Sequence, residues 1–113
     1  LTEKRKDMFI AMIEFVVKEG YETQFIEKWA KVTQGIYLFK GSLGSRLHRN
    51  ENGELIAYAQ WPDQATWEKS NEVKMSEYYE EQRKLMFDSL NLESTRVIYK
   101  MQVEMDYLQI RPF

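Results

Sequence analysis

The stretch that decides the fold runs from Gly41 to Glu68 and reads GSLGSRLHRNENGELIAYAQWPDQATWE. Two strand-like segments flank Asn52-Gly53, and this dipeptide favours a two-residue hairpin turn in which both residues have positive φ. The second strand stops at Pro62, and Asp63 follows as a candidate N-cap for a helix that carries Trp67. The sequence therefore predicts a hairpin followed directly by a short helix.

A two-residue turn at Asn52-Gly53 would also fix the pairing of the two strands. The expected pairs are Asn50 with Leu55, His48 with Ala57, Arg46 with Ala59 and Gly44 with Trp61. Residues directly opposite each other lie on the same face of a sheet. We therefore expect Arg46 and His48 to lie beside two alanines, whose small side chains leave room for a ligand.

Length and composition exclude several classes of protein. The 113 residues are enough for one domain, with 1–7 as a charged lead-in and 8–113 as the domain. The chain has no cysteine and one histidine, which excludes disulfides, a thiol nucleophile and a His-rich metal site within one chain. A net charge of −2 with interleaved signs argues against nucleic-acid binding. No apolar run approaches the ~20 residues of a membrane span, and no signal peptide precedes the domain, so the expected location is the cytoplasm.

Hydrophobic periodicity assigns the rest of the chain. The expected elements are a strand over Met8–Val17, a helix from Glu22 to about Gln34, a helix from about Ser76 to Leu90 and a strand from Thr95 to Ile110. Gly35 weakens the first helix, so Ile36–Phe39 is either its last turn or an apolar connector. The first strand is apolar on both faces apart from Glu14.

The resulting order, β-α-β-β-α-β, predicts an α+β ferredoxin-like fold with an antiparallel four-stranded sheet. The first and third strands should be central, because both are apolar on both faces. Helices cover only one face of such a sheet, so we expect a second copy to cover the other and form a homodimer. The face that pairs carries Ile10, Met12 and Val16, or else Phe9, Ile13 and Phe15. The end of the last strand, Met105–Ile110, should overhang its own sheet and pair with the partner subunit.

Three short patterns carry a family resemblance. They are Lys18-Glu19-Gly20, Gly41-x-x-Gly44-x-x-Leu47-His48-Arg49 and Trp61-Pro62-Asp63-x-Ala65-x-Trp67. From about Phe9 to Tyr99 the chain resembles the antibiotic biosynthesis monooxygenase (ABM) family of dimeric α+β barrels. The patterns specify turns and fold, so the resemblance implies the architecture more directly than the chemistry.

The resemblance also bears on the reaction. The family includes haem-degrading enzymes, which use an Asn on the first strand, a Trp on the helix after the third strand and a later His. Here those places hold Ile13, Trp67 and, over Glu77–Glu81, only Glu and Tyr, so haem degradation is disfavoured. Other members are cofactor-independent monooxygenases that act on polycyclic phenols with Asn, Trp and Arg around the pocket. Trp67 and Arg46 are candidates for the last two.

The predicted catalytic residues are His48, Arg46 and Glu14. An imidazole can take up a phenolic proton near neutral pH, although His48 would have no such role if it faces solvent on an edge strand. Glu14, a lone charge in an apolar strand, must be paired, solvated or protonated. It either serves a pocket or pairs with Arg46 or Lys100.

The predicted substrate-binding residues are Trp67, Tyr78 and Tyr58, whose rings suit the walls of a site for a flat ligand; alternatively such rings only pack helices onto the sheet.

These residues and the resemblance predict a monooxygenase that inserts oxygen from O₂ into an aromatic phenol or quinol. No flavin or metal is expected, because the substrate anion itself supplies the electrons, and no Rossmann or phosphate-loop motif indicates a nucleotide. The alternative is a non-catalytic dimer of the same fold that binds a small aromatic ligand.

Overall fold

The computed structural model of the chain describes residues 7–108. Its elements are β1 (Phe9–Phe15), α2 (Glu22–Lys40), β2 (Gly44–Arg49), β3 (Leu55–Trp61), α3 (Gln64–Lys69), a 3₁₀ turn (Ser70–Glu72), α4 (Glu77–Asp88) and β4 (Arg96–Gln102). The order of strands and helices is the predicted one. Where the β-α-β-β-α-β motif has its second helix, this chain has two, α3 and α4, and the 3₁₀ turn lies between them.

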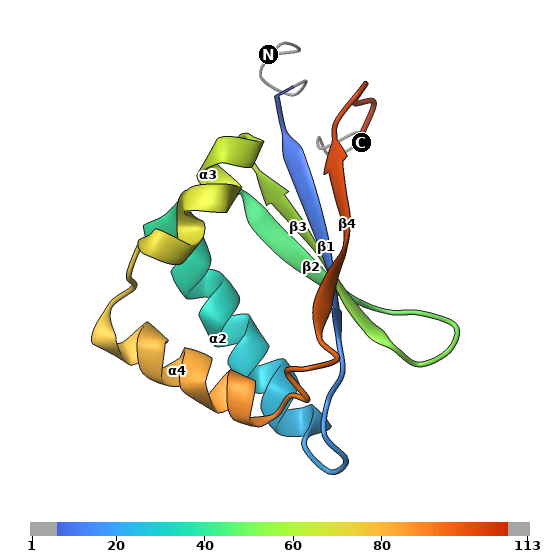
Figure 1. Cartoon of the computed structure of the whole chain (residues 1–113), viewed down its shortest axis with the longest axis vertical. Coiled ribbons are helices and arrows are strands. Elements are labelled where there is room, and N and C mark those ends of the chain that lie inside the picture. The colour runs from blue at the N-terminus through green and yellow to red at the C-terminus, as the bar shows by residue number, and fades with distance from the viewer. Residues whose placement is uncertain (1–6, 109–113) are drawn as a thin grey trace, which may run out of the picture.

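The four strands form one antiparallel sheet in the order β2-β3-β1-β4. This order confirms that the first and third strands are central. The helices lie against one face of the sheet, here called the inner face, which carries Ala11, Ala59 and Trp61 (Figure 1). The opposite, outer face carries the alternate residues, among them Met12 and Tyr58. The fold is therefore the predicted ferredoxin-like α+β arrangement.

The hairpin loop is one residue longer than predicted. The backbone N–H of Gly53 donates to the carbonyl of Asn50, and the N–H of Asn50 donates to the carbonyl of Glu54. Gly53 has φ 82°, whereas no other residue type in the described chain has positive φ, so Asn52 cannot take the place required by a type I′ turn. The side-chain oxygen of Asn50 accepts from the N–H groups of Asn52 and Glu54 and holds this wider loop.

The longer loop shifts the strand pairing by one residue. Arg46 pairs with Tyr58, His48 with Ile56 and Gly44 with Gln60, in place of the predicted alanines and Trp61. A shift of one residue moves every side chain to the other face. The expected register was therefore wrong, and Arg46 and His48 lie on the outer face, away from Ala57 and Ala59.

Helix α2 continues past the predicted end at Gln34 and stops at Gly41, which has φ 84° and forms its left-handed C-cap. Ile36–Phe39 therefore belongs to the helix. Gly35 does not break the helix. The absence of a side chain at this position instead permits a close approach of α4. A Cβ placed on Gly35 would lie 2.7 Å from Cγ of Tyr79 and 2.9 Å from the sulfur of Met75.

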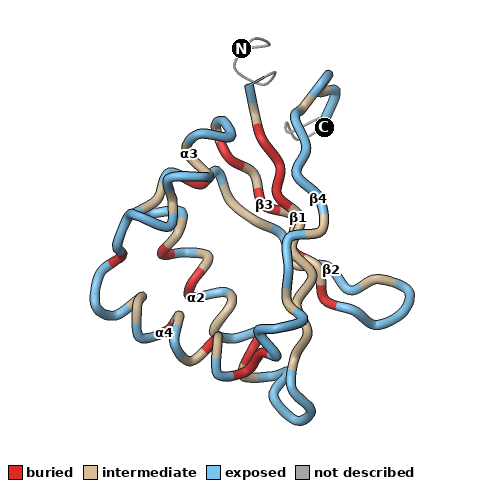
Figure 2. Tube along the Cα trace, in the orientation of Figure 1, coloured by how far each residue is buried: buried red, intermediate tan, exposed pale blue. Residues whose placement is uncertain are grey.

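Two groups of buried side chains fill the space between the inner face and the helices. Figure 2 shows the buried stretches in β1 and β3 and at points along α2 and α4. The larger group contains Phe25, Val32, Leu55, Met75, Met86 and Leu90. The smaller group contains Phe9, Ala11, Ala59 and Trp61, against which Trp67 packs. Ile36 packs against both groups and so links them.

Strand β4 is shorter than the predicted Thr95–Ile110. Just after Gln102 one more backbone hydrogen bond is formed, from the N–H of Val103 to the carbonyl of Met8. Residues 103–108 are not part of a strand. Ile110 lies outside the described residues. The predicted pairing of this end with a partner subunit stays a prediction.

Helix α3 begins as predicted at Asp63, whose carboxylate accepts from the backbone N–H and the hydroxyl of Thr66, both at 2.7 Å. The hydroxyl bond, reinforced by the backbone bond, lowers the pKa of the Asp63 carboxyl. This cap sets the start of the helix that places Trp67 over the inner face.

The lowered pKa of Asp63 predicts a pH-dependent contribution to stability. The stabilising contribution is complete above the ordinary pKa of ~3.9 and is lost as pH falls through the folded-state value below it. Asp63→Ala should therefore lower Tm at pH 7 by roughly 2–5 °C, and the difference from wild type should shrink below about pH 4. Thermal melts across pH check this, with Asp63→Ser as the variant that keeps an uncharged cap. A difference that does not vary with pH would contradict it.

Candidate functional site

A cavity of about 420 Å³ lies between the inner face of the sheet and the helices. We call it the inter-layer cavity. Its apolar wall includes Ile13, Phe15, Ala57, Trp29, Trp67 and Phe87. Ala57 and Ala59 lie between the bulkier Leu55 and Trp61 on the inner side of β3, and both alanines line the cavity. The small side chains of these two alanines thus leave space next to β3, and the aromatic rings of the apolar wall enclose it.

The polar side of the inter-layer cavity is cationic. It includes Lys40 from the last turn of α2 and Arg83 from α4, and no carboxylate is among the described residues that line it. Arg83 lies 3.7 Å from the carboxylate of Glu80 and stacks over the ring of Phe87 at 4.8 Å. Burial lowers the pKa of Lys40, and the charge of Arg83 lowers it further, while Glu80 opposes the shift. The cavity therefore combines aromatic walls with a positive side that favours an anion.

One buried donor in the cavity wall has no partner. Trp61 is 5% exposed, and its Nε1–H finds no hydrogen-bond acceptor in the part of the chain that is described. A buried polar group left unpaired costs about 1–3 kcal/mol. A ligand oxygen or an ordered water beside the indole would remove that cost.

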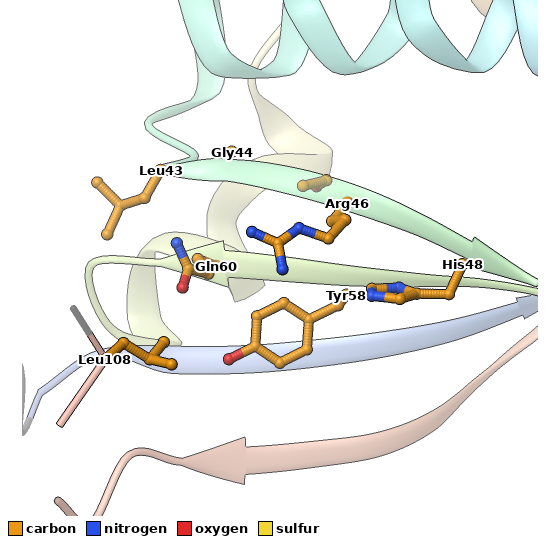
Figure 3. A pocket seen from close by; sticks show the side chains of 8 residues that line it. Leu43, Gly44, Arg46, His48, Tyr58, Gln60 and Leu108 are labelled. Carbon is orange, nitrogen blue, oxygen red and sulfur yellow. The ribbon is translucent and has the colours of Figure 1, made fainter. Parts of the chain in front are cut away.

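The structure divides the predicted site residues between the two faces of the sheet. Trp67 lines the inter-layer cavity, as predicted. Arg46, His48 and Tyr58 instead gather around a second hollow on the outer face, which Figure 3 shows. The expectation that Arg46 and His48 form the polar wall of the cavity beneath the helices was therefore wrong, because the hairpin register differs.

The other two predicted residues lie in neither place. Glu14 pairs with Arg96 at 3.7 Å, and not with Arg46 or Lys100, because the register of β1 with β4 sets Glu14 opposite Arg96. Tyr78 is 52% exposed and packs edge-on against Tyr79, outside the lining of the inter-layer cavity. The catalytic roles assigned to His48, Arg46 and Glu14, and the binding roles of Trp67, Tyr78 and Tyr58, stay predictions.

Comparison with known proteins identifies the family. The family model described as antibiotic biosynthesis monooxygenase matches residues 8–82, from the start of β1 into α4. The chain belongs to the ABM family. The matched segment includes three strands of the sheet and the greater part of the helical layer, and it ends one residue before Arg83. A search of curated proteins returned no match.

Solved structures share this ABM fold at low sequence identity. SnoaB, a cofactor-independent oxygenase from Streptomyces nogalater, matches with TM-score 0.68 and 11% identity, over 91% of this chain and 99% of that one. A conserved protein from Methanosarcina mazei Go1 matches with TM-score 0.68 and 12% identity, over 88% and 96%. Rv0793 from Mycobacterium tuberculosis matches with TM-score 0.66 and 11% identity, over 89% and 99%. At such identities the likeness establishes the architecture alone.

Three residues that bear on the chemistry of the inter-layer cavity were not predicted from the sequence. Arg83 follows Tyr79 by four positions, so helical spacing could have suggested that the two share a side of α4, although not that this side borders a cavity. Lys40 was missed because the helix that carries it was predicted to end too early. Trp61 was considered only as a ring that faces Gly44, and not as part of a pocket; it lies on the inner face with Ala57 and Ala59 and lines the cavity. In residues 7–108 no helix is long and apolar enough to cross a membrane.

Proposed function

We propose that this ABM-family protein is a cofactor-independent monooxygenase whose inter-layer cavity binds an aromatic phenol or quinol as its anion. The observation that carries the proposal is the pairing of aromatic walls with a cationic side, with no carboxylate among the described lining residues. Lys40, Arg83 and Arg96 contribute to that side, and Arg96 is the one that pairs with Glu14. A flat ring system fits such walls. A phenolate or enolate oxygen would be stabilised by Arg83, a cation already in place before reaction, and by Lys40 once that amine has taken up the substrate's proton.

The proposed reaction needs no electron donor besides the substrate. For an anthrone, the ring CH₂ and O₂ become C=O and H₂O, so one oxygen atom enters the product and the other leaves as water. The step that the protein must assist is removal of a proton, since the anion then transfers electrons to O₂. Arg83 would hold the anionic oxygen, and Lys40, whose pKa is lowered, would accept the proton.

Replacing Arg83 tests this function directly. In Arg83→Gln, kcat/KM for a hydroxyanthrone should fall about 10- to 100-fold, because one charge-assisted contact to the anion is lost. Anthrone absorbance and an oxygen electrode measure the reaction. The control is Arg49→Gln, since Arg49 pairs at the surface with Glu22, outside the cavity. Equal turnover by Arg83→Gln and wild type would contradict the assignment.

One observation favours the second candidate, a protein that binds an aromatic anion without oxidising it. Among the described residues that line the cavity there is no imidazole and no carboxylate to take the substrate's proton. Saturable binding of the hydroxyanthrone with no oxygen consumption would favour this binder over the enzyme. Turnover that depends on Arg83 would favour the enzyme.

We further propose that two copies pair through the outer face of the sheet. The half of this face formed by β1 and β4 carries Met12, Tyr99 and Met101, which the helices do not cover. Tyr99 is 60% exposed, and Met105 and Tyr107 in the segment after β4 are more exposed still. An apolar surface of this kind suits a homodimer interface.

A further inference from the structure

The reaction proposed for the inter-layer cavity makes no use of the buried indole in its wall. Trp61 is the last residue of β3, lies opposite Phe9 on β1 and lines the cavity. In residues 7–108, Nε1 of Trp61 is the buried side-chain nitrogen or oxygen atom that has no hydrogen-bond partner. An indole nitrogen can donate a hydrogen bond but cannot accept one. Only an acceptor can therefore satisfy Trp61.

The side chains that surround Trp61 cannot supply this acceptor. The same buried group contains Phe9, Ala11 and Ala59, and the side chains of Ile36 and Trp67 pack against it. Four of these five side chains carry no polar atom, and the indole of Trp67 is itself a donor. A change of rotamer within the group would thus leave Nε1 unpaired. A molecule that enters the cavity can bring the acceptor.

The cationic side of the cavity lies at the same end as Trp61. Lys40 is the last residue of α2, and three residues later the backbone N–H of Leu43 donates to the carbonyl of Gln60 at 2.8 Å. Three residues span at most about 11 Å, so Lys40 stays near the end of β3 that carries Trp61. Arg83 is close to Lys40, because its charge adds to the effect of burial in lowering the pKa of Lys40. A neutral donor and two basic side chains therefore border the same end of one cavity.

We infer that the ligand of the inter-layer cavity is an aromatic hydroxy-ketone whose carbonyl oxygen accepts a hydrogen bond from Nε1 of Trp61. Its phenolate oxygen would lie beside Arg83 and Lys40, so the two oxygens share one edge of the ring system. A site with a buried donor rejects a ligand that lacks the acceptor, because the donor is then left unpaired. Trp61 is thus a specificity-determining residue.

This inference rests on the proposed function only in that a phenolic anion binds in the inter-layer cavity. It requires no reaction with O₂. The cavity lies beneath the helices, on the inner face of the sheet, so the inference also leaves the outer face to the second copy.

A matched pair of ligands tests the inference. In 1-hydroxyfluorenone a carbonyl group lies next to the phenol, and 1-hydroxyfluorene has a CH₂ group in the same place. Calorimetry measures the Kd of both ligands for wild type and for Trp61→Phe, which keeps an aromatic ring without the N–H. Wild type should prefer the ketone, and this preference should fall about three- to tenfold in Trp61→Phe. Differences between the ligands in acidity or solubility affect both proteins alike and cancel in the comparison.

The matched control is Trp29→Phe, the same substitution at another indole that lines the cavity. It should leave the ratio of the two dissociation constants as in wild type. A second measurement needs no substitution of Trp61. The chain has three tryptophans, so the Nε1–H signal of Trp61 in an NMR spectrum is identified by elimination with Trp29→Phe and Trp67→Phe. In wild type the ketone should move this signal downfield by more than the hydrocarbon does, because a hydrogen bond deshields the proton.

The outcomes separate this inference from the proposed reaction. An equal ketone preference in wild type and Trp61→Phe, the same NMR shift with both ligands, or failure of the ketone to bind wild type would each overturn it. Oxygen consumption with hydroxyanthrone is recorded separately. A ketone preference that depends on Trp61, without oxygen consumption, would remove the oxygenase and keep the inference. Turnover without that preference would do the reverse.

Discussion

The Gly35→Val variant is expected to lose about 2 kcal/mol or more of its free energy of unfolding. A Cβ at this position would lie 2.7 Å from Cγ of Tyr79, an atom near the base of that side chain that cannot swing aside freely. Overpacking a tight contact typically costs about 1–3 kcal/mol, and valine adds two further methyl groups. The better helix propensity of valine offsets only a few tenths of a kcal/mol. Urea unfolding followed by circular dichroism measures the loss.

The matched control for this prediction is Ala30→Val, which places valine at an exposed position of the same helix. Only the modest propensity difference, about 0.5 kcal/mol, is expected there. If Gly35→Val loses no more stability than Ala30→Val, then α2 and α4 do not depend on the close approach at Gly35. The separation of these helices matters for function as well, because α2 carries Lys40 and α4 carries Arg83 to the same cavity.

The hairpin shows which features a short stretch of sequence predicts and which it does not. The Asn-Gly dipeptide located the turn correctly, and Pro62 and Asp63 located the strand end and the helix cap. The turn type was wrong because Asn50, two residues earlier, uses its side chain to hold a loop with an extra residue. That one residue decided which face of the sheet received Arg46 and His48. A site prediction built on strand register fails as a whole when the register moves by one.

Gly35 and Arg83 show a different limit. The sequence indicated that Gly35 weakens the helix and left Ile36–Phe39 open, because propensity is a local property, while the role of this glycine depends on Tyr79, 44 positions along the chain. Arg83 faces the cavity through the packing of α4 on α2, which no local pattern specifies completely. In contrast, the strand order followed directly from sequence. Strands β1 and β3 are apolar on both sides, and a central strand in a sheet that is covered on both faces needs that composition.

The Tyr99→Asp variant is expected to raise the dissociation constant of the proposed homodimer by about 100-fold or more. Tyr99 lies on the outer face of β4, opposite Met12, in the half of the face formed by β1 and β4. Its side chain is 60% exposed in the single chain, although it borders an apolar surface. A buried aromatic residue at an interface contributes about 2 kcal/mol or more, and a carboxylate in its place would have to be desolvated without a partner. Sedimentation equilibrium over a range of protein concentrations measures the constant.

The control is Leu38→Asp, because Leu38 on α2 is 59% exposed and lies on the helical layer rather than on the outer face of the sheet. The nearly equal exposure and the same introduced carboxylate control for general effects of exchanging a large apolar surface residue for a charge. If the outer face is the interface, Leu38→Asp keeps the wild-type dissociation constant and Tyr99→Asp does not. A dimer weakened equally by both, or by Leu38→Asp alone, would place the interface on the helices. A wild-type chain that sediments as a folded monomer at micromolar concentration would contradict the proposed dimer. The half of the outer face formed by β1 and β4 would then be exposed to solvent.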